Sequence, residues 1–138
     1  MKRGILVVMV AFSLLFSSCS IEDDAPNFHF TALSITNAEV PESFVLNQTY
    51  KINVTYLLPN GCTSYEGFDV SNEDITTRNV VVVGAVHTDA VSCTEQVIEQ
   101  EASFNFVVIY NEPYTFKFYQ GDNSDGEPEF LEIVVPVE

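Results

Sequence analysis

The chain contains very few positively charged residues. Lysine and arginine together number 5, against 20 aspartate and glutamate residues, and the formal net charge is −15. Two of those five, Lys2 and Arg3, precede the first long apolar stretch, so the rest of the chain is more acidic still. Such a chain repels the phosphates of nucleic acids and the headgroups of anionic lipids, which excludes both as favoured partners.

The chain also lacks the short motifs that accompany common enzyme chemistries. Gly-x-Ser-x-Gly, His-Glu-x-x-His and a glycine-rich phosphate loop are all missing. Histidine occurs twice, and neither His29 nor His87 stands at a metal-ligand spacing from a cysteine. Both are expected at the surface, His29 on an edge strand and His87 at a strand end. Carboxylates are abundant, but a domain of this size has little room for a sugar cleft beside its core. The sequence therefore predicts a protein without catalytic activity, cofactor or metal.

No apolar run is long enough to span a bilayer. The longest run, residues 5–16, covers about twelve residues, whereas a spanning helix needs about twenty. Basic residues precede it and Ser17 and Ser18 follow it, which is the order of segments in a secretory signal. The sequence thus predicts an exported protein with residues 1–18 as its signal peptide.

The residues that end this signal resemble a known motif. Phe16-Ser17-Ser18-Cys19 resembles the lipobox of bacterial lipoproteins, in which the cysteine is the first residue after the cut and its thiol receives diacylglycerol. That family prefers leucine where Phe16 stands, so the match departs there by one bulky apolar residue. The resemblance implies that a lipid on Cys19 attaches the chain to a membrane. The alternative is an ordinary signal that is cut near Ser18, with Cys19 free or paired.

An acidic run follows the cysteine. It resembles the short export signal of surface lipoproteins from Bacteroidota-type bacteria, with Ser20, Glu22, Asp23 and Asp24 as the signal residues. This resemblance implies an outer-membrane lipoprotein displayed on the cell surface. The alternative is a solvated acidic linker, with the domain on the periplasmic face. Residues 19–27 are accordingly expected to form a lipidated acidic tether.

Two cysteines remain once Cys19 is set aside. Cys62 and Cys93 allow one intramolecular pairing, and exported chains meet an oxidising compartment. We therefore predict a disulfide between them.

Residues 28–138 show the alternation of β-strands. The clearest case is residues 49–57, where Tyr50, Ile52, Val54 and Tyr56 share one face. The valine run at residues 80–83 is typical of a strand buried on both faces. Residues 95–101 are the only local helix former, and they predict either a single helical turn or the start of a long strand. The expected strands are residues 28–35, 49–57, 62–70, 79–87, 102–109, 114–119 and 130–137.

About seven short strands with frequent turns predict an all-β fold, a single antiparallel β-sandwich over residues 28–138. The architecture resembles immunoglobulin-like and fibronectin-type modules. The tryptophan common in true immunoglobulin domains is missing, because the chain has none. Cys62 and Cys93 also stand on other strands than the usual pair. The resemblance therefore implies the architecture and not membership of that family.

The loop at residues 121–127 offers oxygen ligands. Asp122, Asn123 and Asp125 are candidates for calcium, but the helix-loop-helix calcium pattern places Gly121 where a side-chain ligand is required. The alternatives are a looser calcium site or a hairpin loop in which Asp125 and Gly126 form the turn. Tyr119 is a candidate surface contact for a protein or glycan ligand that the sequence does not identify.

Three functions are compatible with these features. The first is a lipid-anchored envelope protein that acts as a non-enzymatic surface binding or adhesion accessory. The second is a structural or assembly subunit of an envelope complex that uses exposed strand edges. An enzyme or enzyme inhibitor ranks third.

Overall fold

Eight β-strands make up the described part of the chain. The computed structural model describes residues 25–138, and within that range no helix is long and apolar enough to cross a membrane. The residues predicted to act in lipidation and export, Cys19, Ser20, Glu22, Asp23 and Asp24, lie outside the described residues. The strands are β1 (Phe28–Leu33), β2 (Ile35–Glu39), β3 (Thr49–Leu58), β4 (Thr63–Asn72), β5 (Thr77–His87), β6 (Ile98–Val107), β7 (Tyr114–Asp122) and β8 (Pro128–Val135).

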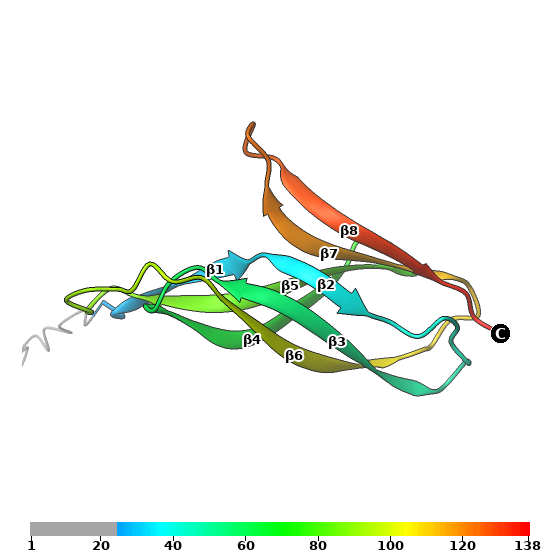
Figure 1. Ribbon diagram of the computed structural model, residues 1–138. Helices are drawn as coiled ribbons and strands as arrows, with labels where there is room; N and C mark the ends of the chain where they lie inside the picture. Colours follow the sequence, from blue (N-terminus) through cyan, green and yellow to red (C-terminus); the bar gives the residue numbers. More distant parts are fainter. Residues whose placement is uncertain (1–24) are drawn as a thin grey trace, which may run out of the picture.

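The strands form two sheets (Figure 1). In the five-stranded sheet, β5 pairs with β4 along one side and with both β1 and β7 along the other, and β8 follows β7. The three-stranded sheet has the order β2-β3-β6. Apolar side chains from both sheets meet between them in one core. The architecture is all-β in two sheets, as a β-sandwich requires, with eight strands where about seven were expected.

One ladder corrects the prediction of an antiparallel sandwich. β5 and β7 run parallel, with Thr77 opposite Thr115 and Val80 opposite Phe118. Parallel neighbours need a crossover connection, and the chain makes it through β6 in the other sheet. β4 and β5 form a hairpin and run in opposite directions. The pairing is parallel because β5, and not β4, lies beside β7.

The chain changes sheets at Ser34. β1 belongs to the five-stranded sheet and β2 to the three-stranded sheet. The residues on either side of the change, Leu33 and Ile35, are both buried in the core, and the Ser34 C=O accepts the Leu57 N–H at 3.0 Å. Two apolar residues separated by one residue thus reach the same core from different sheets. The sequence predicts a single strand over residues 28–35, whereas the chain forms two strands there, so β2 was not predicted.

β3 and β6 form the regular part of the three-stranded sheet. Ile52, Val54 and Tyr56 of β3 point into the core, which confirms the alternation read from the sequence. β6 begins at Ile98 and pairs with β3 along its whole length. The start of a long strand was therefore the correct alternative for residues 95–101, and the Tyr56 hydroxyl donates to Gln100 Oε1 at 3.1 Å.

The core is rich in aromatic rings, and Phe44 closes one end of it. Phe44 lies outside the named strands but is completely buried. Its ring contacts those of Tyr50, Phe106, Tyr114 and Phe116, with centroids 4.8–6.0 Å apart. Its backbone N–H donates to the Pro136 C=O at 2.8 Å. The segment between β2 and β3 is therefore part of the folded core.

Candidate functional site

The first strand exposes aromatic side chains. Because Leu33 points into the core, the period of two along β1 places Phe28, Phe30 and Ala32 on the outer face of the five-stranded sheet. Phe30 is 64% exposed and Phe28 is 38% exposed. The two rings meet edge to face with centroids 5.3 Å apart. Burial in the core does not account for these rings.

A shallow apolar hollow lies beside Phe30. It has a volume of about 240 Å³ and is lined by Phe30, Thr31, Ala32, Asp69, Val81 and Val83. The valines come from the outer side of β5, where both are half-buried, so the prediction that this run is buried on both faces was wrong for its outer face. We call the surface formed by Phe28, Phe30, Ala32, Val81 and Val83 the Phe30 face.

Polar side chains border the Phe30 face at the end of β5. The His87 ring lies 6.4 Å from the Phe28 ring, centroid to centroid, and its Nε2 is 3.1 Å from Ser64 Oγ. The Ser64 hydroxyl also donates to Glu66 Oε1 at 3.0 Å. Nucleophilic catalysis requires the hydroxyl proton to pass to the imidazole while a third group orients that ring. Here the carboxylate contacts the hydroxyl instead, an arrangement suited to hydrogen bonding with a ligand.

None of the three cations in the described residues belongs to the Phe30 face. Lys51 lies on β3, in the other sheet. Arg78 is buried, and its Nη1 donates to the C=O groups of Asp74, Ile75 and Thr77 at 3.0–3.2 Å. Lys117 is paired with Glu73 at 2.8 Å, and this hydrogen bond lowers the pKa of the Glu73 carboxyl. All three cations of residues 25–138 therefore lie away from the Phe30 face.

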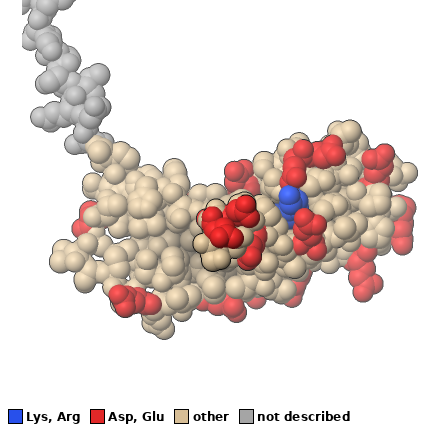
Figure 2. Space-filling model, turned by 90° about the horizontal axis from the view of Figure 1, so that it is seen from above, with Lys and Arg blue, Asp and Glu red and all other residues tan. Residues whose placement is uncertain are grey.

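The surface charge is distributed unevenly. Seen from above, acidic side chains gather towards the end of the molecule away from the grey trace, and the surface next to that trace is mostly uncharged (Figure 2). β1 begins at the uncharged end, directly after the first described residues.

Tyr119 lies on a different part of the sheet. Its hydroxyl donates to Asp122 Oδ1 at 3.0 Å, and its ring meets Phe130 edge to face at 6.2 Å. Burial, followed by the contact with Asp122, raises the pKa of Tyr119. The side chain is half-buried, so less of it is free for a ligand than the sequence analysis expected.

The acidic loop between β7 and β8 uses its oxygens locally. Asn123 Oδ1 accepts the backbone N–H groups of Asp125 and Glu127 at 2.9 and 3.0 Å. Gly126 has a φ of 78°, as a tight hairpin requires. Among residues 25–138, no group of three or more His, Cys, Asp or Glu side chains is placed to hold a metal ion. The geometry is that of the hairpin-loop alternative, and calcium binding by Asp122, Asn123 and Asp125 stays a prediction.

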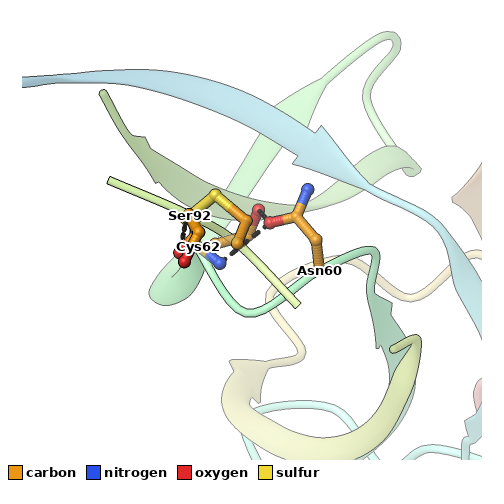
Figure 3. Close-up of a disulfide and its surroundings, with 5 residues drawn as sticks. Asn60, Cys62 and Ser92 are labelled. Carbon is orange, nitrogen blue, oxygen red and sulfur yellow. Dashed lines mark hydrogen bonds between the residues drawn. A yellow bond between two sulfur atoms is a disulfide. The ribbon is translucent and has the colours of Figure 1, made fainter. Parts of the chain in front are cut away.

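Cys62 and Cys93 form the predicted pair. Their sulfur atoms lie at bonding distance, with Cα atoms 5.3 Å apart (Figure 3). The Asn60 side chain accepts the Cys62 N–H at 3.0 Å and the Thr63 hydroxyl at 2.9 Å. The bond fastens the long connection between β5 and β6 to the start of β4. It therefore holds in place a loop that consists mostly of exposed residues.

The Phe30 face was not predicted from the sequence. The sequence places His29 at the surface, and because Phe28 and Phe30 alternate with His29, that interpretation turns the two rings towards the core. In the structure His29 is exposed, but the two rings lie on the outer face. The signal that decides this is Leu33, whose burial sets the phase of the strand.

No protein-family model, curated protein or solved structure matches this chain. Its function is therefore inferred from its own sites.

Proposed function

We propose that this chain is a lipid-anchored protein of the cell envelope that binds a partner at the cell surface and catalyses no reaction. The observation that carries the proposal is the Phe30 face. Phe30 is 64% exposed beside an apolar hollow, in a chain whose surface is otherwise strongly acidic. Contiguous exposed apolar surface on a folded domain typically marks a site of interaction.

The polar border supports binding in preference to catalysis. Ser64, Glu66 and His87 offer hydrogen-bond donors and acceptors beside the aromatic rings. The hollow has a volume of about 240 Å³, which is small for a substrate pocket. It is large enough for an apolar side chain of a partner protein. Apolar anchors bordered by polar groups are the usual anatomy of a protein–protein interface.

The fold proposed for this role is immunoglobulin-like. One contact supports it: the Tyr114 hydroxyl, at the start of β7, accepts the N–H groups of Ile109 and Tyr110 at 3.1 and 3.0 Å. Immunoglobulin sandwiches contain a comparable tyrosine corner. The parallel ladder between β5 and β7 departs from that family.

A second role, as an assembly subunit of an envelope complex, is favoured by one further observation. β1 pairs with β5 alone among the described strands, so its other edge is open for pairing.

The anchoring part of the proposal is tested by metabolic labelling with a fatty-acid analogue. The wild-type chain should be labelled and Cys19→Ala should not. Protease added to intact cells should remove the wild-type domain. Changing Glu22, Asp23 and Asp24 to Ala should protect the domain by retaining it inside. Labelling of both chains contradicts lipidation, and protection of the wild type contradicts surface display.

The binding part is tested by capture from the source's own envelope extract. The double variant Phe28→Ser and Phe30→Ser should bind the partners captured by the wild type roughly tenfold more weakly. Those partners should therefore be lost from the captured material. Val134→Ser is the matched control, because Val134 is 63% exposed and lies on β8. Retention of the same partners by all three chains contradicts a role for the Phe30 face.

A further inference from the structure

The outer edge of β1 carries unpaired backbone groups. The Thr88 N–H donates to the Asn27 C=O at 2.8 Å, and the ladder continues from Phe28 opposite His87 to Leu33 opposite Val82. Antiparallel ladders alternate, so His29 and Thr31 direct their backbone groups to β5. The N–H and C=O groups of Phe28, Phe30 and Ala32 therefore face away from β5. Figure 1 places this strand at the margin of the five-stranded sheet.

β1 lacks the features that protect the other edge strands. Such edges are usually blocked by bulges, prolines or charged side chains. β2 and β4 contain register shifts, and the carboxylates and proline on the other edges are Glu39, Glu66, Asp69, Glu99, Glu101, Pro128, Glu129 and Glu132. The sequence of β1, Phe-His-Phe-Thr-Ala-Leu, has no carboxylate, lysine or proline, and its register is unbroken. Among the described edge strands, β1 is the one that is regular and uncharged over its whole length.

We propose that β1 pairs antiparallel with β1 of a second copy of this chain. A register centred on Phe30 is self-complementary. It places Phe30 opposite its own counterpart, Phe28 opposite Ala32, and His29 opposite Thr31. All three outward-facing residues then exchange backbone hydrogen bonds, and no carboxylates oppose each other. The two Phe30 faces join into one continuous aromatic surface.

The length of chain before β1 fits this arrangement. In this register Phe28 lies opposite Ala32, so the Phe28 residues of the two copies are about 15 Å apart. Residues 19–27 reach at most about 30 Å when extended, so both tethers can enter one bilayer. This step rests on the proposed lipid anchor, which also confines the copies to a surface and raises their effective concentration.

The net charge determines how salt affects the pairing. Each copy is strongly negative, so the two bodies repel each other although β1 itself is uncharged. Added salt screens this repulsion and strengthens the pairing. A basic partner on the same edge would show the opposite dependence.

Cysteine cross-linking of the full chain in membranes tests the proposal. In the proposed register, Phe30→Cys meets its counterpart across the two-fold axis at about 5.5 Å between Cα atoms, within disulfide range. Val134→Cys is the control, because Val134 is 63% exposed and Phe30 is 64% exposed. We expect Phe30→Cys to yield a reducible species of twice the monomer mass and Val134→Cys to remain monomeric.

A second measurement uses the chain without an added cysteine. The wild type purified in detergent should shift towards twice its mass as salt rises from low to high concentration. Phe30→Pro, which removes an outward-facing N–H and leaves the β5 ladder intact, should stay monomeric. The proposal is overturned by equal cross-linking at both cysteines, by cross-linking of Phe30→Cys to a different protein, or by a wild type that stays monomeric at high salt. These outcomes are independent of the labelling and protease tests of the anchor.

Discussion

Replacing Phe44 with alanine should destabilise the protein more than a change in a loop ordinarily does. Phe44 lies between β2 and β3, yet it is 0% exposed and contacts four aromatic rings. Truncation leaves a cavity between Tyr50, Phe106, Tyr114 and Phe116. Changes of this type cost about 3–5 kcal/mol through lost burial and the cavity that remains. Whole domains of this size are stable by only about 5–15 kcal/mol.

The assay is urea unfolding of the purified protein, followed by circular dichroism. The midpoint should fall with little change in slope, and the thermal midpoint should drop by roughly 10 °C or more. Val45→Ala is the control, because the neighbouring Val45 is 47% exposed and should cost about 0.5 kcal/mol. A loss below about 1 kcal/mol for Phe44→Ala would show that this segment does not close the core.

Three further changes test other contacts. Reducing the Cys62 disulfide, which links positions 31 residues apart, should lower the free energy of unfolding by about 3–4 kcal/mol; equal urea midpoints with and without reductant would refute this. Arg78→Met should cost about 1–3 kcal/mol, because three backbone carbonyls lose their donor, and an unchanged midpoint would argue against that role. Lys117→Met should raise the pKa of Glu73 back towards its ordinary value of 4.5 in an NMR titration. Since the pKa of Glu73 is lowered in the folded state, its stabilising effect is present above the unfolded pKa and is lost as pH falls through the folded pKa.

The sequence predicted every described strand except β2, because the alternation of apolar and polar residues along a strand is a local property. Ile52, Val54 and Tyr56 face the core as their spacing indicates, and Cys62 pairs with Cys93. The parallel ladder was not predictable in this way. The strand that lies beside β7 is determined by how the β4–β5 hairpin packs against the rest of the fold. The local sequence of β5 contains no signal for this packing.

The candidate site was harder to predict than the fold. Phe28 and Phe30 carry the strongest apolar signal of the first strand, so a single-strand interpretation directs them inward. The change of sheet at Ser34 buries Leu33 and Ile35 instead, and the phenylalanines face outward. Tyr119 was a candidate for an exposed position, but it is half-buried because the hairpin register brings Asp122 and Phe130 into contact with it.

The central claim is that a partner covers the Phe30 face at the cell surface. Labelling of intact cells with a membrane-impermeant maleimide tests this claim directly. Phe28→Cys is the probe and Tyr110→Cys is the control, because the two side chains are 38% and 42% exposed. We predict rapid labelling of Tyr110→Cys and slow labelling of Phe28→Cys on cells, with equal rates for the purified monomers. Equal rates on intact cells would contradict the claim.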